Sequence, residues 1–184
     1  MNERMEGVNM ELWDVYTKTR EKTGRTHIRE SKMRLAEGEY HIVIDVWTFL
    51  PDGRLLLTQR DPAKPSGLLW EGTGGSITTG ETSLIGAVRE VEEEIGLHLN
   101  PEELVLAGEI IRNDSLIDVY VTRLPRLIAI EELSFQEGEV VDAKLVTKEE
   151  FYEMGEAGLL TKNMLPRYEL FQELMDSYFE PHNT

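Results

Sequence analysis

The chain has 184 residues, enough for one domain with a buried core but not for two large domains. Its 40% apolar and 29% charged residues are typical of a globular protein, and no apolar run approaches the roughly 18 residues needed to span a bilayer. The formal net charge of −16 argues against a nucleic-acid polymer as partner, and the absence of cysteine excludes disulfides, thiolate metal sites and cysteine nucleophiles.

The N-terminal segment is polar. Its first ten residues, MNERMEGVNM, lack the apolar centre of a signal peptide, and with the absence of cysteine this predicts a cytoplasmic protein without membrane contact. Two runs separated by charged residues, 12–16 and 24–28, predict a two-stranded N-terminal ribbon. The expected organisation is an N-terminal extension over residues 1–38, a main domain over 39–180 and a polar tail over 181–184.

A strand, a hairpin and a loop follow. The run from His41 to Leu50, HIVIDVWTFL, is rich in β-branched and aromatic residues and predicts a strand. The turn at Pro51-Asp52-Gly53 and the following RLLLTQR predict its hairpin partner. A loop rich in Pro and Gly, residues 61–67, and a small-residue stretch, residues 72–75, then lead to a helix over residues 81–97.

The second half of the chain combines strands and helices. Thr147 with Glu150 forms a capping-box signature for a short helix. The spacing of apolar residues predicts a longer amphipathic helix near the C-terminus. The hairpins imply antiparallel pairs, so the expected fold class is α+β, with helices packed on a mixed sheet. The further strands are expected over residues 104–111, 117–123 and 144–146, and the longer helix over 162–179.

The helix in the middle of the chain has an acidic face. At 100° per residue, Glu90, Glu93 and Glu94 share an arc of about 100° turned away from an apolar stripe. Like charges at this spacing repel by roughly a few tenths of a kcal/mol per pair, and oxygen ligands of this kind suit Mg²⁺, with Mn²⁺ as an alternative. Arg89, one turn before Glu93, offsets only part of the charge. The helix alone leaves open a second interpretation, a solvated acidic face ended by Gly96 as C-cap.

The segment before this helix favours the metal site over the solvated acidic face. Gly75, five residues, Glu81, seven residues and then the run REVEEEIGL from Arg89 to Leu97 fill every specified position of the Nudix box. The chain therefore resembles the Nudix family. The resemblance implies the Nudix fold, an α/β/α sandwich with a mixed sheet, here with the N-terminal ribbon added. It also implies a Mg²⁺-dependent hydrolase that cleaves a phosphoanhydride bond in a nucleoside diphosphate linked to another group.

The resemblance implies a role for each matching position. The metal would be bound by Gly75, through its carbonyl, and by Glu90, Glu93 and Glu94. Glu81 and Arg89 would support these ligands, and Glu90, Glu93 and Glu139 are the catalytic candidates, because Glu139 in FQEGEV resembles a loop glutamate that serves as ligand or base in some members. Arg60 and Lys64 are candidates for binding substrate phosphates, with surface solvation as the alternative. A small-molecule nucleotide partner and a homodimer are compatible with the family.

Outside the box, the leader LWDVYTKTREKTGRTHIRE and the strand EYHIVIDVW resemble the Nudix subgroup related to isopentenyl-diphosphate isomerase. The catalytic cysteine of that family falls near Gly74, its neighbouring histidine at Ser76, and its second-site glutamate near Asp118. Because the chain has no cysteine, a hydrolase is favoured over an isomerase. His41 is interpreted as a structural strand residue. A nucleotide-binding sensor without turnover is a third hypothesis, disfavoured because all the box carboxylates are present.

Overall fold

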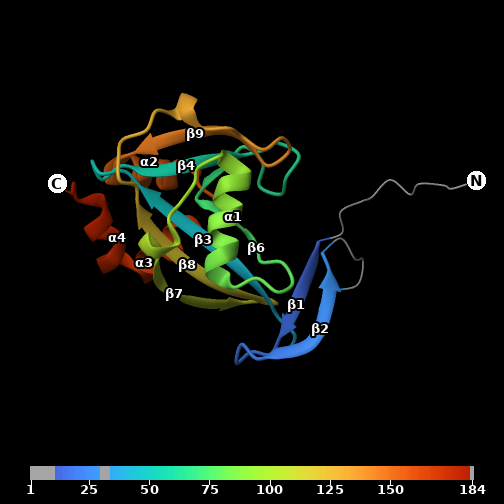
Figure 1. Cartoon of the computed structure of the whole chain (residues 1–184). Helices are drawn as coiled ribbons and strands as arrows, with labels where there is room; N and C mark the ends of the chain where they lie inside the picture. Colours follow the sequence, from blue (N-terminus) through green and yellow to red (C-terminus); the bar gives the residue numbers. More distant parts are fainter. Residues whose placement is uncertain (1–10, 30–33, 183–184) are drawn as a thin grey trace, which may run out of the picture.

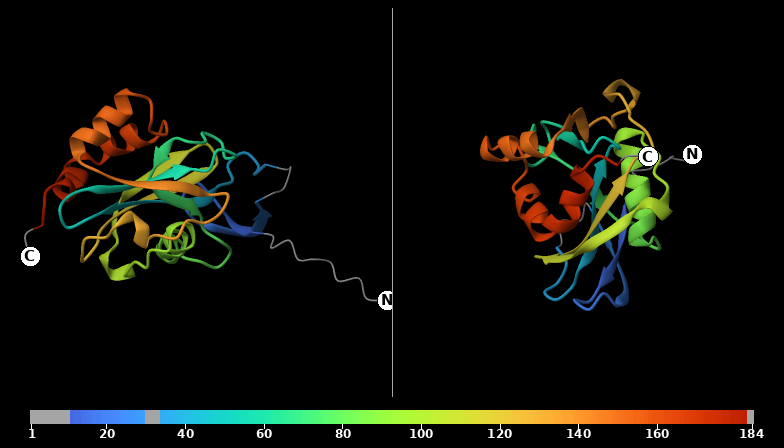
Figure 2. Two further views of the ribbon diagram at one scale, coloured as in Figure 1. Left: turned by 90° about the horizontal axis from the view of Figure 1, so that it is seen from above. Right: turned by 90° about the vertical axis from the view of Figure 1, so that its left-hand side faces the viewer.

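The structure, a computed structural model, describes residues 11–29 and 34–182. A mixed seven-stranded sheet lies between α1 on one face and α2, α3 and α4 on the other (Figures 1 and 2), which confirms the expected α+β sandwich. Parts of the expected extension, residues 1–10 and 30–33, and residues 183–184 of the expected tail lie outside the described residues.

The elements follow the expected order. The strands are β1 (Leu12–Tyr16), β2 (Lys22–Ile28), β3 (His41–Phe49), β4 (Leu55–Arg60), β5 (Trp70–Glu71), β6 (Thr73–Ser76), β7 (Val105–Arg112), β8 (Ser115–Arg123) and β9 (Val140–Val146). The helices are α1 (Ser83–Ile95), α2 (Lys148–Glu156), α3 (Met164–Leu170) and α4 (Gln172–Phe179), with two short 3-10 turns at Pro101–Glu103 and Ile130–Glu132. The capping box of Thr147 and Glu150 begins α2 as expected.

β3 is the centre of the sheet. It pairs in parallel with β8 along its whole length, from His41 beside Ser115 to Phe49 beside Arg123. Its last residues form the expected antiparallel hairpin with β4, across a turn in which Gly53 has a φ of 86° that favours glycine. Its first half pairs with β6 and places Gly75 opposite Ile44. The box glycine is therefore held by the central strand.

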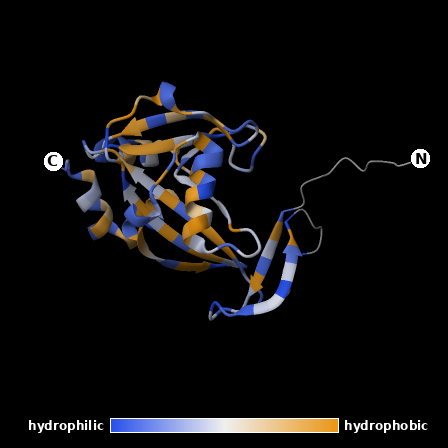
Figure 3. Ribbon diagram, in the orientation of Figure 1, coloured by the Kyte–Doolittle hydropathy of each residue, from blue (hydrophilic) through white to orange (hydrophobic). Residues whose placement is uncertain are grey.

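The two faces of the sheet bury separate apolar clusters. On the α1 side, Ile44 of β3 packs with Val91 and Ile95 of the helix. On the other side, Trp47 packs with Phe151 of α2 and other residues of the C-terminal helices. Figure 3 shows the apolar residues along the central strands, in contrast to the mainly polar β2. α1 is thus fixed on the sheet by its apolar stripe, as the helical spacing predicts.

The N-terminal ribbon of β1 and β2 is attached to the domain by the buried Tyr16, by the stacking of Trp13 on His41 and by polar contacts. The Thr79 amide donates to the carbonyl of Leu12 at 2.8 Å, and the Gly80 amide donates to Oδ2 of Asp14 at 3.0 Å. At the ribbon turn, Arg20 donates to the buried carboxylate of Asp118 at 2.5 Å. The ribbon therefore binds directly to the segment between Gly75 and Glu81, just before α1.

The expectation of one helix over residues 162–179 is wrong, because the segment forms two helices. Phe171, with φ −118° and ψ 28°, separates α3 from α4. The Phe171 ring packs against Gly108 of β7, so closely that a Cβ added to Gly108 would lie 2.9 Å from the ring Cζ. This contact anchors Phe171 on the sheet at the turn between the helices. Tyr168 of α3 and Met175 of α4 are both buried as a result.

No helix in residues 11–29 and 34–182 has the length and apolar character that a membrane crossing requires.

Candidate active site

α1 begins and ends at defined caps. The side chain of Thr82 accepts from the Ile85 amide at 3.3 Å, and Gly96, at φ 69°, donates to the Glu92 carbonyl. Burial of Val91 on the sheet fixes the rotation of the helix. Glu90 and Glu94 are consequently directed toward β6 and the loops that follow β4 and precede β9.

Glu90 lies directly against the box glycine. A Cβ added to Gly75 would come within 2.5 Å of both carboxylate oxygens of Glu90, so no residue with a side chain fits here unless Glu90 moves. The absence of a side chain at Gly75 therefore brings a main-chain carbonyl and a carboxylate together. Two residues that were predicted as metal ligands are therefore in contact, and their role as ligands stays a prediction.

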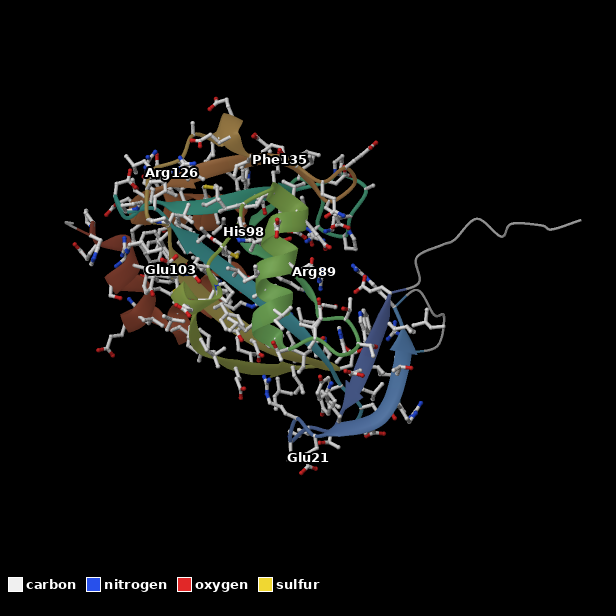
Figure 4. The ribbon with its side chains drawn as sticks, in the orientation of Figure 1. Glu21, Arg89, His98, Glu103, Arg126 and Phe135 are labelled. Atoms are coloured by element: carbon white, nitrogen blue, oxygen red, sulfur yellow. The ribbon has the colours of Figure 1, made fainter. Side chains whose placement is uncertain are left out.

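Arg89 is the centre of an ion-pair cluster. Its Nε and Nη2 donate to the two oxygens of Glu81 at 2.7 and 2.9 Å. Its Nη1 donates to Glu90 at 3.0 Å and to Glu93 at 2.8 Å, and Nη2 also donates to the carbonyl of Ser76 at 3.2 Å. In Figure 4 the Arg89 side chain lies on the side of α1 that faces the ribbon. Arg89 thus joins Glu81, Glu90 and Glu93 in one cluster, and the supporting role of Glu81 and Arg89 stays a prediction.

The three predicted carboxylates differ in their surroundings. The side chain of Glu93 is 51% exposed and faces Arg89, that of Glu90 is 12% exposed, and Glu94 is buried. Within the described residues, no three His, Asp or Glu side chains are grouped closely enough to hold a metal ion as they stand. A shared site requires Glu93 to turn from Arg89 toward Glu90. The helical projection treats the three carboxylates alike. In the structure, by contrast, Glu94 is buried, Glu90 is half-buried and Glu93 is exposed.

Burial makes the carboxyl groups of Glu90 and Glu94 hard to ionise. It raises the pKa of Glu94 to about 8, and the nearby charges of Glu90 and Glu71 act in the same direction, whereas Lys64 opposes them. Burial also raises the pKa of Glu90, with Arg89 opposing it. Buried carboxylates of this kind gain stability from a nearby cation. An all-oxygen donor set with raised pKa values fits a hard divalent metal.

Two loops bring the remaining predicted residues to the same region. Lys64, after β4, forms an ion pair with Glu139, which precedes β9. Arg60 forms an ion pair with Glu71 and donates through Nε to the carbonyl of Pro65 at 2.8 Å. The fold thus brings Lys64 and Glu139 together, whereas Arg60 mainly supports its own loop.

Glu71 is a residue that the sequence analysis missed. It follows the buried Trp70 in β5, and its pKa is raised by burial, with Arg60 opposing the shift. Its proximity to Glu94 and Lys64 adds a negative charge to the pocket. The only signal in the sequence is an acidic residue between Trp70 and the small-residue stretch, which is too weak to single it out.

His41 and Asp118 have structural contacts. The His41 ring stacks on Trp13 at a centroid distance of 4.0 Å, and its Nε2 lies 3.1 Å from the hydroxyl of Ser115. Burial lowers the pKa of His41 to about 4, which keeps the ring neutral. Asp118 is paired with Arg20. These contacts agree with the interpretation of His41 as a structural strand residue.

Replacement of Gly75 by alanine is expected to lower kcat/KM for hydrolysis by about ten- to a hundredfold, because the new methyl group displaces the Glu90 carboxylate. The flexible end of Glu90 absorbs the clash, so the free energy of unfolding should change by less than about 1 kcal/mol. Steady-state kinetics at increasing Mg²⁺, with thermal unfolding, test this. A variant with unchanged kinetics would show that Gly75 does not position Glu90.

Comparisons with known proteins agree with this geometry. The family model described as NUDIX domain matches residues 39–172. An uncharacterized Nudix hydrolase of Listeria monocytogenes is 36% identical over 153 residues, covering 81% of this chain and 87% of the relative.

Two solved structures share the fold. DR0079 from Deinococcus radiodurans has a TM-score of 0.68 at 20% identity, covering 89% of this chain and 98% of that one. The NUDIX domain of Shewanella oneidensis NrtR, solved with ADP ribose, has a TM-score of 0.60 at 19% identity. The match covers 74% of this chain and 88% of that one. The isomerase-related subgroup stays a prediction. The family match and the Listeria relative show that the chain belongs to the Nudix family and is a Nudix hydrolase.

Proposed function

We propose that the chain hydrolyses a phosphoanhydride bond in a nucleoside diphosphate linked to another group, with Mg²⁺ as its metal ion. The observation that carries this proposal is the buried Glu94 with Glu90 beside Gly75, an oxygen-rich cluster in which burial opposes ionisation. Nudix hydrolases generally use divalent metals. Mg²⁺ is the first choice because it prefers oxygen ligands and bridges to substrate phosphates, and Mn²⁺ is the alternative.

The metal would be held by Glu90, Glu94 and the Gly75 carbonyl, with Glu93 joining them after turning from Arg89. When bound, it withdraws charge from the phosphoryl oxygens and acidifies a bound water. Arg89 stays on Glu81 through its bidentate contact and keeps Glu90 beside Gly75. This division explains why one arginine touches three acids of the same motif.

Proton transfer and phosphate binding are assigned to residues at the end of β4, in the loop that follows it and in the loop before β9. Glu139 is the proposed base, because a carboxylate on the loop before β9 can take the proton of the attacking water without leaving the metal site short of a ligand. Glu90 and Glu93 are the alternative bases. Lys64 supplies a cation for a substrate phosphate oxygen, and Arg60 a second one through Nη2. A homodimer stays part of the proposal.

The first substrate to test is ADP ribose. It is the ligand bound to the NUDIX domain of NrtR, and it consists of a nucleoside diphosphate linked to a second group. Nucleotide sugars, dinucleotides and nucleoside di- and triphosphates complete the panel. Hydrolysis in ¹⁸O-labelled water identifies which phosphorus is attacked, because the label enters that product.

Removal of divalent metal is expected to abolish hydrolysis. Activity against the panel should fall to the blank level in EDTA and return with excess Mg²⁺ or Mn²⁺, because the buried carboxyl groups supply no Lewis acid themselves. Colorimetric phosphate release after phosphatase treatment measures this. Activity that persists in EDTA would contradict the metal assignment. Binding of ADP ribose by calorimetry without turnover would favour a sensor, and deuterium exchange into isopentenyl diphosphate would favour an isomerase.

A further inference from the structure

Lys64 is a cation close to three acidic residues, Glu139, Glu94 and Glu71. Its ammonium group forms an ion pair with Glu139, and Glu94 and Glu71 are close enough to influence its protonation. The side chains of Lys64 and Glu139 are only 22% and 30% exposed. A half-buried lysine among three acids differs from a surface lysine, because solvent screens its charge less.

The loop of Lys64 is held by its own hydrogen bonds. The Lys64 amide donates to the Asp61 carbonyl at 3.0 Å, and the Ala63 amide donates to the Asp61 carboxylate at 2.8 Å. The Asp61 amide in turn donates to the Glu139 carbonyl at 2.9 Å. The main chains carrying Lys64 and Glu139 are therefore joined, and this keeps the two side chains within reach of each other.

The loop of Glu139 is joined to α1 at the metal-binding end. The Gln136 amide donates to the main-chain carbonyl of Glu94 at 2.9 Å, and the Ser134 amide donates to that of Ile95 at 3.0 Å. Figure 4 places Phe135, between these two residues, beside this end of α1. Lys64, Glu139 and Glu94 thus belong to one connected unit, although they come from three parts of the chain.

The positive charge of Lys64 lies close enough to Glu94, a proposed metal ligand, to oppose the rise of its pKa. An ammonium group and a metal ion are both attracted to this carboxylate, and they repel each other. Arg60 does not compete with the metal ion in this way, because its guanidinium group is held by Glu71 and the Pro65 carbonyl.

We propose that Lys64 is an internal counter-ion that opposes metal binding until substrate arrives. The ammonium group pairs with Glu139 before substrate binds. It then moves to a substrate phosphate oxygen, which frees Glu139 to take the proton of the attacking water. This inference rests on the proposed hydrolase function. It predicts that one substitution tightens metal binding and weakens catalysis, two effects that loss of packing alone would not produce together.

The test is titration of Mn²⁺ into the metal-free full chain, followed by electron paramagnetic resonance of the unbound ion. At low salt, Lys64→Met should bind Mn²⁺ about three- to tenfold more tightly than the original chain. Its kcat/KM for ADP ribose should fall about tenfold or more. Lys64→Arg keeps the charge and should keep the original Mn²⁺ affinity. Lys162→Met, which removes an exposed lysine, controls for net charge.

Three results would overturn the proposal. One is unchanged or weaker Mn²⁺ binding by a Lys64→Met variant that unfolds at the original temperature. Another is equal tightening in Lys162→Met. The third comes from Glu139→Gln: if Lys64→Met tightens Mn²⁺ binding as much in that background, the ion pair with Glu139 is not what holds Lys64 against the metal site. If instead Lys64→Met tightens Mn²⁺ binding while the original chain cleaves no compound of the panel, the counter-ion role is supported and the proposed hydrolysis fails.

Discussion

Glu94→Gln is expected to lower kcat/KM by about a thousandfold, which corresponds to about 4 kcal/mol of lost transition-state stabilisation. Glu94 is buried beside Glu90, and its proposed metal-binding oxygen becomes an amide with much weaker affinity for Mg²⁺. Glutamine has nearly the same shape, so the fold should persist. Steady-state kinetics at saturating Mg²⁺ and titration of Mn²⁺ measure the two parts of this loss.

Glu92 offers a matched control for Glu94. It lies on the same helix two residues earlier, is 56% exposed at its side chain, and contacts only His98 among the ion pairs of the described chain. Glu92→Gln makes the same chemical change on the solvent side and should keep kcat/KM within about twofold. Equal losses of kcat/KM in both variants would mean that the overall negative charge of the helix, and not a specific contact of Glu94, supports activity. A fully active Glu94→Gln would remove Glu94 from the metal site.

Glu94→Gln, which is expected to reduce activity, should increase the stability of the metal-free chain. Burial raises the pKa of Glu94 to about 8, whereas its ordinary value is 4.5. Between these pH values the folded chain keeps a proton that the unfolded chain releases, so the free energy of unfolding falls as pH rises from about 4.5 to 8. A glutamine at this position does not ionise, so the variant does not lose stability in this pH range. In EDTA, Glu94→Gln should therefore become progressively more stable than the original chain up to pH 8, as urea unfolding at several pH values can show.

Arg89→Met is expected to reduce both stability and activity. The substitution leaves Glu81, Glu90 and Glu93 without the guanidinium group that now joins them. Since the Arg89 side chain is only 25% exposed, the free energy of unfolding should fall by about 2 kcal/mol, or roughly 4–8 °C in Tm. Hydrolysis should fall by about a hundredfold, because Glu90 is no longer held beside Gly75.

The stability part of the Arg89 prediction depends on pH. Burial of Glu81 opposes ionisation, but hydrogen bonds from Arg89 and Thr78 prevail and keep its pKa below the ordinary value of 4.5. The stabilisation from this pair is therefore present above pH 4.5 and lost as pH falls through the lowered pKa. Arg126→Met, which breaks an exposed pair with Glu132, should leave the free energy of unfolding nearly unchanged, because solvent screens this pair. A loss of similar size in both variants would argue against the Arg89 cluster.

The helix and hairpins were predictable because their signals are local. The apolar stripe of α1, the turn at Gly53 and the capping box of Thr147 each depend on residues within a few positions of one another. The break at Phe171 was not predictable, because it depends on contact with Gly108, far earlier in the chain. The division of the chain at residues 38 and 39 stays a prediction.

The site was predictable in its residue types but not in its burial. A helical projection treats Glu93 and Glu94 alike, yet Glu94 is buried where the loop before β9 bonds to the end of α1, and Glu93 stays exposed beside Arg89. The pairing of β5 with β4 brings Glu71 to Arg60 by a similar long-range contact. Helical periodicity contains no information about either contact. The roles of the predicted catalytic and metal-binding residues stay predictions until the variants are measured.

The position of Gly75 beside the central strand has a consequence for how this enzyme can diversify. Gly75 and Glu90 depend on β3, which β8 supports along its full length, so sequence changes there would disturb the whole sheet. The segments around Lys64 and Glu139 are instead loops beside β4 and β9, and loops tolerate insertions that keep these two residues in place. Proteins with this architecture can therefore vary the group that they recognise through the loops while the contact between Gly75 and Glu90 is kept.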